Sequence, residues 1–205
     1  MPAAFSLPPF SAALIAGGQS SRMGTDKAAL DFAGQPLWKH QLATLRATGA
    51  DEVIIAGRAD GPYAGGDCEV IPDRTPGLGP LAGLEAALRR ARHDWLLVLA
   101  VDLPDVPATF LRDLVAEAVA AGCGRVPARE DWLQPIAAIY PRRCLPLVER
   151  CLAGENRSLR RFVRLARREG YADVRPLNAE EYVLFRNLNT PADLAAGPTG
   201  FSTLP

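Results

Sequence analysis

A glycine loop and two cations near the start of the chain form the first cluster that could do chemistry. Gly17 and Gly18 directly follow an apolar run, and Arg22 and Lys27 come a few positions later. Because glycine has no Cβ, backbone N–H groups there can approach a ligand closely. Backbone donors beside an arginine and a lysine are typical of a triphosphate site. The alternative is a glycine turn with solvated charges.

A carboxylate follows the longest apolar run in the sequence. That run covers residues 95–101, and Asp102 comes directly after it. At the carboxyl end of a parallel strand, such a carboxylate could hold Mg²⁺ together with phosphate oxygens and water. The alternative is a cap of the turn that follows. Asp105 is the weaker metal candidate, and we expect it to cap the helix that begins near Pro107.

The elements that would position these residues alternate along the first half of the chain. Buried strands are predicted at 10–16, 53–56, 69–71 and 95–100, and helices at 36–48, 80–92 and 107–121. Strands that are apolar on both faces and alternate with helices are typical of a parallel sheet covered on both sides. Right-handed crossovers bring the strand ends to one edge. Residues 15–27, 72–83 and 101–105 are therefore expected to meet there.

The second half has a different pattern. Two strands are predicted within 125–140 around the polar turn 129–131, helices at about 142–152 and 157–169, short strands at 171–175 and 182–186, and a last helix from Pro191. No linker separates the halves, so we expect one domain over residues 1–197. Residues 198–205 lack periodicity and are predicted to be a flexible tail.

Composition and charge exclude several classes of protein. The chain has 205 residues, 48% of them hydrophobic, and Lys+Arg and Asp+Glu both total 23, so no overall field favours nucleic acid or an anionic membrane. The longest apolar run is far shorter than the ~20 residues of a membrane helix. Four scattered cysteines and two separate histidines disfavour zinc and a disulfide framework. Residues 1–21 contain no Lys or Arg, and we expect a cytoplasmic protein.

Residues 15–30, IAGGQSSRMGTDKAAL, match neither the P-loop pattern nor the dinucleotide-binding pattern. They resemble the A-G-G-x-S-x-R-M-G-x-D-K signature of Rossmann-like nucleotidyltransferases, specifically the molybdenum cofactor guanylyltransferases. Other segments resemble the same family in the same order: G-P-L-A-G at 79–83, D-x-P at 102–104, Q-P at 134–135 and N-x-N-T-P at 187–191.

The resemblance implies a three-layer α/β fold of the Rossmann-like nucleotidyltransferase type, with a mostly parallel central sheet and helices on both faces. It implies transfer of GMP from GTP to the phosphate of molybdopterin, release of pyrophosphate, and Mg²⁺ as cofactor. Residues 10–122 would then form the nucleotide-binding part and residues 123–197 the acceptor-side part. Transient contact with molybdopterin-handling or molybdoenzyme-maturation proteins would follow, without nucleic acid or membrane partners.

The same resemblance assigns roles to individual positions. Arg22, Lys27 and Asp102 would be catalytic, with Asp102 as the metal ligand. The GTP-binding positions would be Ile15, Ala16, Gly17, Gly18, Ser20, Lys27, Asp73, Gly79, Pro80, Leu81, Ala82, Gly83 and Asp102. The acceptor-binding positions would be Gln134, Pro135, Asn187 and Asn189. For Lys27 the alternative is a solvated ion pair with Asp26.

Asp73 is the candidate for recognising the base. Guanine presents N1–H and N2–H₂ side by side, and one carboxylate can accept both hydrogen bonds, whereas cytosine offers no such pair. The alternative is turn chemistry, because residues 73–77 are rich in turn formers. A cytidylyl- or sugar-phosphate nucleotidyltransferase, and a non-catalytic nucleotide-binding regulatory protein of the same fold, remain alternative functions.

A basic run in the second half matches no motif. Residues 157–168, RSLRRFVRLARR, contain six arginines and no acid. Such a run is either a solvated helical face or a basic patch that holds the pterin phosphate or an acidic partner. Trp132, close to Gln134, is the tryptophan that could contact a pterin. Arg58 lies in a loop where the resembled family often has asparagine, and its role is open.

Overall fold

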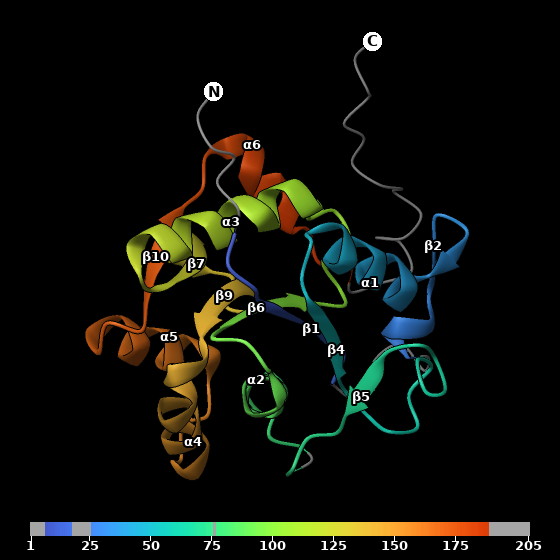
Figure 1. The fold of residues 1–205 in the computed structure, drawn as a ribbon, viewed down its shortest axis with the longest axis horizontal. Coiled ribbons are helices and arrows are strands. Elements are labelled where there is room, and N and C mark those ends of the chain that lie inside the picture. Colours follow the sequence, from blue (N-terminus) through green and yellow to red (C-terminus); the bar gives the residue numbers. More distant parts are fainter. Residues whose placement is uncertain (1–6, 18–25, 76, 189–205) are drawn as a thin grey trace.

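The structure is a computed structural model that describes residues 7–17, 26–75 and 77–188. Within these residues, a central sheet lies between two layers of helices (Figure 1). The strands of the sheet run in the order β10-β7-β9-β6-β1-β4-β5, with β8 paired to β7. Their bounds are β1 Ser11–Ile15, β4 Glu52–Ala56, β5 Glu69–Ile71, β6 Trp95–Ala100, β7 Gly124–Arg129, β8 Trp132–Leu133, β9 Ala137–Pro141 and β10 Ala172–Pro176.

Most strands of this sheet run in the same direction. β1 pairs in parallel with β4 and β6, β4 with β5, and β10 with β7, whereas β9 is antiparallel to both β6 and β7. Because two antiparallel pairings restore the original direction, β7 points the same way as β6. The carboxyl ends of β1, β4, β5, β6 and β7 therefore lie along one edge, as the sequence predicts for the first four.

Helices cover both faces of the sheet. α1 (Leu37–Ala47) and α3 (Ala108–Ala121) lie on one face, and α2 (Pro80–Arg90), α4 (Leu145–Ala153) and α5 (Leu159–Arg168) lie on the other (Figure 1). Successive residues of β1 alternate between the two cores: Leu14 packs with the α1 and α3 side chains, and Ile15 packs with those of α2. Strands buried on both faces give the predicted three-layer α/β architecture.

Local signals explain where several helices begin and end. α2 begins after Gly79, whose φ of 74° lies in the left-handed region, and Pro80 occupies its first turn. α3 ends at Gly122, also left-handed. α5 begins at Ser158, whose side chain accepts a hydrogen bond from the backbone N–H of Arg161.

One predicted element is wrong. Residues 182–186 do not form a strand: α6 (Ala179–Tyr182) is followed by the 3₁₀ turn η3 (Val183–Phe185). The cause is a capping box, in which the Asn178 side chain accepts from the backbone of Glu181 and the Glu181 side chain accepts from the backbone of Asn178. This reciprocal pair starts a helix directly ahead of an apolar segment that resembles a short strand.

Smaller elements complete the chain. A hairpin of β2 (Asp31–Phe32) and β3 (Gln35–Pro36), unpredicted from the sequence, precedes α1, and 3₁₀ turns form at η1 (Lys27–Ala29) and η2 (Arg142–Cys144). All four cysteines are free. In the part of the chain that the structure describes, no helix combines the length and apolar character that a membrane span requires. The helix predicted from Pro191 and the tail at 198–205 lie outside the described residues.

Candidate functional site

Lys27 and Asp102 meet at the carboxyl edge of the sheet. Lys27 opens η1, Asp102 follows β6, and Lys27 Nζ lies 3.5 Å from Asp102 Oδ2. Their side chains are 22% and 25% exposed, so both charged groups remain accessible to a ligand. The two candidates for phosphate and metal binding are therefore in direct contact, and the alternative pairing of Lys27 with Asp26 is not the one observed.

Asp26 has a structural role in this loop. Its Oδ1 accepts a hydrogen bond from the Ala28 N–H at 3.0 Å and caps η1, while Oδ2 lies 3.0 Å from Arg58 Nη2. The Arg58 N–H in turn donates to the hydroxyl of Tyr63 at 2.8 Å. Arg58 thus joins the loop after β4 to the turn that carries Lys27, and this contact accounts for an arginine at this position.

Asp73 lies in a cradle formed by two glycines. A Cβ built on Gly17 would lie 3.6 Å from Asp73 Oδ2, and one built on Gly83 would lie 3.7 Å from Oδ1 and 3.4 Å from Ile15 Cγ2. Side chains at these positions would fill the space beside the carboxylate. Asp73 Oδ1 is buried and has no hydrogen-bond partner among the described residues. A buried acceptor without a partner is costly for the folded protein, which is typical of a group that waits for a ligand.

The electrostatics of the cradle oppose ionisation of Asp73. Burial raises the pKa of the Asp73 carboxyl, and the negative charge of Glu85 raises it further. A ligand that donates hydrogen bonds to the ionised carboxylate would offset both effects. The raised pKa and the unpartnered oxygen together favour a donor pair as the group that Asp73 binds.

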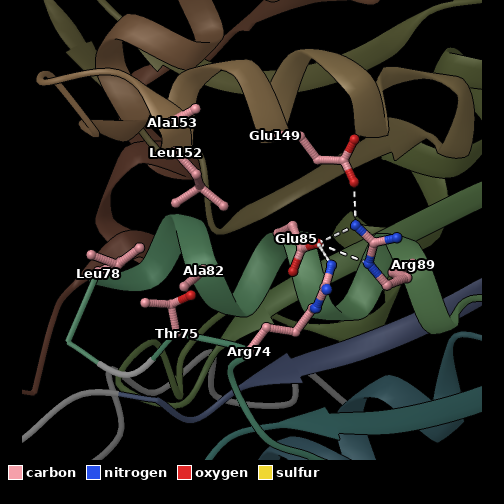
Figure 2. Close-up of a pocket in the computed structure, with 9 residues that line it drawn as sticks. All are labelled: Arg74, Thr75, Leu78, Ala82, Glu85, Arg89, Glu149, Leu152 and Ala153. Carbon is pink, nitrogen blue, oxygen red and sulfur yellow. Dashed lines mark hydrogen bonds and ion pairs between the residues drawn. The ribbon is translucent and has the colours of Figure 1, made fainter.

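Glu85 of α2 contacts the loop after β5 directly and is linked to α4 through Arg89, as Figure 2 shows. Its side chain is only 6% exposed, and Oε1 accepts from Arg89 Nε at 2.8 Å and Nη2 at 2.6 Å. Arg74, next to Asp73, reaches the same oxygen at 3.7 Å, and Arg89 also bonds Glu149 of α4. These residues line a groove of about 450 Å³ between α2 and α4. Glu85 is not among the residues predicted from the sequence, although an acid on the apolar side of a predicted helix is the pattern that indicates such a buried carboxylate.

The segment 79–83 forms the start of α2 beside this cradle. Gly79 precedes the helix, and the Ala82 N–H donates to its carbonyl at 3.0 Å. Leu81 is fully buried, and Gly83 faces Asp73 and Ile15. Gly83 therefore lies beside Asp73, whereas a Cβ built on Gly79 would meet nothing within 4 Å.

Backbone and side-chain hydrogen bonds position the described acceptor-side candidates, and one of these bonds reaches Asp102. The Leu188 N–H donates to the carbonyl of Asp102 at 2.9 Å, which brings the adjacent Asn187 to the end of β6. Gln134 is buried, and its N–H donates to the Pro127 carbonyl at 2.9 Å. The carbonyl of Pro135 accepts from the hydroxyl of Tyr140 at 2.8 Å. The Ala100 N–H donates to the Ile136 carbonyl, so the segment from Gln134 to β9 passes beside the end of β6.

Asp105 does not cap α3. The residue at the start of that helix is Pro107, and no side chain caps it. Asp105 Oδ2 instead lies 3.0 Å from Arg186 Nε, and its side chain is only 4% exposed. Because Arg186 binds its carboxylate, Asp105 is neither the predicted helix cap nor well placed to be a metal ligand. The same ion pair holds the segment that carries Asn187.

Gln41 is a buried polar residue close to the edge that sequence reasoning did not assign. Its Nε2 donates to the Ala100 carbonyl at 2.9 Å, and its Oε1 is buried without a hydrogen-bond partner in the described residues. Neighbouring His40 Nε2 lies 3.1 Å from the Pro104 carbonyl. Both side chains therefore hold the backbone on either side of Asp102. The sequence pattern that indicates them is a pair of polar residues on the apolar face of the helix predicted at 36–48.

Several predicted site residues lie outside the described residues. These are Gly18, Ser20, Arg22 and Asn189. The described members that gather at the edge come from six separate segments of sequence: Ile15 to Gly17, Lys27, Asp73, residues 79–83, Asp102 and Asn187.

The donor set at Asp102 fits a metal held mainly by its substrate. Among the described residues, no group of three or more His, Cys, Asp or Glu side chains could hold an ion by itself. Asp102 offers one partly exposed carboxylate at the open edge. Mg²⁺ commonly takes one or two carboxylates and completes its octahedron with phosphate oxygens and water. The residues present therefore fit a magnesium ion that arrives with a nucleotide.

A mostly parallel sheet with helices on both faces, a glycine after its first strand and carboxylates at its carboxyl edge are the features expected of a Rossmann-like nucleotidyltransferase. Residues 12–173 match the MobA-like NTP transferase domain, and the chain belongs to this family. The sequence is 40% identical over 184 residues to a probable molybdenum cofactor guanylyltransferase of Opitutus terrae, covering 88% of this chain and 91% of that protein. It is 34% identical over 193 residues to the molybdenum cofactor guanylyltransferase of Pseudomonas putida (strain GB-1), covering 93% and 97%.

A solved structure shows the same fold. The crystal structure of molybdopterin-guanine dinucleotide biosynthesis protein A from Archaeoglobus fulgidus superposes with a TM-score of 0.75 at 26% identity, covering 91% of this chain and 95% of that one. The family, the three-layer fold and the nucleotidyltransferase class predicted from the sequence are thereby confirmed.

Proposed function

We propose that this protein transfers GMP from GTP to the phosphate of molybdopterin, forming molybdopterin guanine dinucleotide and releasing pyrophosphate. The observation that carries this proposal is the contact of Lys27 with Asp102 at the sheet edge that also bears the Asp73 cradle. Charged groups that can bind a triphosphate and a carboxylate that can accept hydrogen bonds from a base are thus available along one edge of the sheet. The names of the relatives, molybdenum cofactor guanylyltransferases, support the choice of substrates.

The reaction requires little covalent chemistry from the protein. A phosphate oxygen of the acceptor attacks the α-phosphorus of GTP, the bond between the α-phosphorus and its bridging oxygen breaks, and pyrophosphate leaves with that oxygen. Lys27, Arg22 and the backbone N–H groups of Gly17 and Gly18 would bind the phosphates and neutralise the charge that grows on their oxygens. They would also hold the attacking oxygen and the α-phosphorus in line.

Asp102 would hold Mg²⁺ against the triphosphate. The bound ion supplies positive charge to the phosphoryl oxygens and to the departing pyrophosphate. Asp102 contributes one negative ligand, and its contact with Lys27 keeps the two groups close enough to act on the same phosphates. The nearby Gln41 supports this arrangement because it binds the backbone carbonyl of Ala100 at the end of β6.

Asp73 would select guanine. Its buried oxygen lacks a partner among the described residues, and the N1–H and N2–H₂ groups of guanine would supply two donors. Gly17 and Gly83 leave space beside the carboxylate for the ring. The other candidate contacts of the nucleotide are Ile15, Ala16, Gly79, Pro80, Leu81 and Ala82. Cytosine has no adjacent donor pair, so this chemistry favours GTP over CTP and disfavours the cytidylyl alternative.

The acceptor would lie on the far side of Asp102 from the base. Gln134, Pro135, Asn187 and Asn189 are its candidate contacts, and the bond from Leu188 to the Asp102 carbonyl supports the placement of Asn187. Residues 10–122 would then bind the nucleotide and residues 123–197 the acceptor. A cytoplasmic location and transient contacts with molybdopterin-handling or molybdoenzyme-maturation proteins belong to the same proposal.

Pyrophosphate release tests this function directly. The full-length protein is incubated with Mg²⁺ and GTP, CTP or UTP, each with and without molybdopterin, and the pyrophosphate released is measured. We expect release with GTP only when molybdopterin is present. Release with CTP or UTP at the same rate would contradict the guanine assignment, and no release with any nucleotide would favour a non-catalytic nucleotide-binding protein.

A further inference from the structure

Another groove lies farther along the same edge of the sheet. The nucleotide features occupy the ends of β5, β1 and β6, and beyond β6 the sheet continues with β9 and β7. Because β7 points the same way as β6, its end at Arg129 faces the same edge. There a groove of about 530 Å³ is lined by Arg129, Glu130, Asp131, Trp132, Arg160 and Tyr182. This volume is in the range of pockets for small organic ligands, roughly 300–1,000 Å³.

A tight hairpin fixes one wall of the groove. Arg129 of β7 pairs directly with Trp132 of β8, so their side chains lie on the same face of the hairpin. The two residues between them, Glu130 and Asp131, form the turn, and both are exposed. Glu130 adopts a φ of 53°, in the left-handed region that such a two-residue turn requires. Two carboxylates, an arginine and an indole are thereby held within four consecutive positions.

Aromatic side chains form a second part of the lining. The Trp132 ring meets the Tyr182 ring edge to face at 5.1 Å between centroids and the Phe185 ring at 5.5 Å. Phe185 packs in turn on Phe110 of α3, which anchors the cluster in the core. Tyr182 and Val183 are the large hydrophobic side chains that the described residues leave exposed, at 38% and 51%. The aromatic cluster therefore packs against the core on one side and is exposed at Tyr182 on the other.

Two arginines border these rings. The Arg129 guanidinium lies 5.0 Å from the centroid of Tyr182, and Arg160 Nη2 donates to the Asp131 carbonyl at 3.0 Å. The second contact brings α5, the helix with the arginine run, to the groove. Arg164 lies one turn farther along α5, is exposed, and does not line the groove. Only part of the arginine run is thus directed to this site.

The groove connects with the catalytic edge through a short segment. Gln134 to Ile136 leads from the hairpin to β9, and the Ile136 carbonyl accepts from the N–H of Ala100, two residues before Asp102. A ligand anchored in the groove could therefore extend along Gln134 and Pro135 toward Asp102. This direction fits an acceptor whose phosphate must reach the nucleotide.

We infer that this groove binds the pterin ring of the acceptor, with the side chains of Trp132 and Tyr182 packing against the ring and the hairpin carboxylates and arginines binding its polar edge. A pterin has an amide N–H beside an amino group, a donor pair that Glu130 or Asp131 can accept. It also has a ring carbonyl oxygen, to which the guanidinium of Arg129 or Arg160 can donate. The inference rests on the proposed function, which makes a phosphorylated pterin the acceptor.

Two variants with matched controls test the inference in the full-length protein. Tyr182→Leu keeps an apolar side chain against Trp132 but removes the aromatic ring, and Arg160→Gln removes the cation from an exposed position. Their controls are Val183→Ala, at the neighbouring exposed residue, and Arg164→Gln, one turn along α5. The probes are fluorescent hydroxymethylpterin, titrated at equilibrium, and molybdopterin as acceptor in the pyrophosphate-release assay. Circular dichroism checks that each variant is folded.

We expect each groove variant to weaken hydroxymethylpterin binding and to raise the KM for molybdopterin by about tenfold, the effect of losing one aromatic or charge-assisted contact. GTP affinity and the two controls should match the wild type. Because guanine shares the donor and acceptor edges of a pterin, a parallel loss of GTP affinity would overturn the inference and assign the groove to the nucleotide. Unchanged pterin binding and unchanged acceptor KM in both groove variants would also overturn it.

The wild-type reaction separates this inference from the proposed function. If the wild type releases pyrophosphate from GTP and molybdopterin while the groove variants behave like their controls, only the inference fails. If the wild type releases none under any condition, the proposed function fails whatever the groove variants show. Should Tyr182→Leu fail to fold, Arg160→Gln still decides, because its side chain lies at the surface.

Discussion

Lys27 Nζ and Asp102 Oδ2 lie 3.5 Å apart, although one residue precedes α1 and the other follows β6. An exposed ion pair contributes little to stability, so stability alone does not explain the contact. Both groups are about a quarter exposed, and both lie at the edge where ligands bind in parallel α/β sheets. Their arrangement matches a site in which a cation binds phosphate oxygens and a carboxylate holds the metal between them.

The first prediction concerns base selection by Asp73. Asp73→Asn preserves the shape of the side chain but replaces one acceptor oxygen with a donor, which would face the donors of guanine. We expect the preference for GTP over CTP to fall by about 1–3 kcal/mol. Calorimetric titration with both nucleotides measures it, and Asp113→Asn on the exposed side of α3 is the control. An unchanged preference would return Asp73 to the turn chemistry considered as its alternative.

The second prediction concerns the stability of the protein without ligand. Burial and Glu85 raise the pKa of Asp73 above its ordinary value of 3.8. The folded protein therefore binds this proton more tightly than the unfolded chain, and the free energy of unfolding falls as pH rises through the interval between the two pKa values. Asp73→Asn has no such proton to lose. We expect its stability relative to the wild type to increase as pH rises through that interval.

Urea unfolding at a series of pH values, from about pH 4 to pH 8, measures this difference. The difference should grow from the acid end and then become constant once Asp73 is ionised in both states. An Asn variant that is less stable than the wild type at neutral pH would show that the carboxylate is well stabilised without ligand. That result would also weaken the interpretation of its unpartnered oxygen.

The third prediction separates Glu85 from Glu149. Both acids bond Arg89, but the Glu85 side chain is 6% exposed and that of Glu149 is 42% exposed. Glu85→Gln would leave a buried group with weaker hydrogen bonds, and we expect it to lower the free energy of unfolding by about 1–2 kcal/mol. Glu149→Gln should change it by no more than about 0.5 kcal/mol. Equal losses of unfolding free energy in the two variants would indicate that Glu85 and Glu149 stabilise the protein as one network, and that their difference in burial has no effect.

Much of the fold could be predicted because its strands are unambiguous. The run from Trp95 to Ala100 has no polar residue, and each predicted strand of the first half is present within a residue or so. Asp102 could be placed at the ligand edge for the same reason, since any residue directly after such a strand must emerge there. The strand predicted at 182–186 was wrong because a short apolar segment fits a strand and a helical turn equally well, and the Asn178 to Glu181 capping box decided between them.

Contacts between distant segments could not be predicted. Nothing in the sequence near Asp105 indicates that it pairs with Arg186, and nothing near Leu188 indicates its bond to the Asp102 backbone. Arg160 was recognised as part of a basic run, but its direction toward the hairpin at Asp131 depends on how α5 packs. The sequence shows that these residues are present, whereas their contacts in space depend on tertiary packing.

The last prediction concerns Asp102. A single carboxylate that holds Mg²⁺ against a triphosphate should matter more in the transition state than in binding, because charge on the bridging oxygen grows as the bond to the α-phosphorus breaks. Asp102→Asn keeps the shape and removes the charge, so we expect kcat to fall by roughly 10²-fold or more, about 3 kcal/mol of barrier, with a modest change in GTP affinity.

Single-turnover rates at increasing Mg²⁺ concentrations provide the measurement for Asp102→Asn, with Asp113→Asn as the control for charge at the surface. If Asp102 holds the ion, high Mg²⁺ should restore part of the lost rate, because mass action compensates for a weaker site. Thermal unfolding should change little, since the side chain is partly exposed and its ion pair with Lys27 contributes little to stability. A variant that turned over at the wild-type rate at low Mg²⁺ would make Asp102 a turn residue. Because Asp105 is bound to Arg186 and Asp26 caps η1, neither carboxylate would then be an obvious replacement ligand, and the metal would be held mainly by the nucleotide.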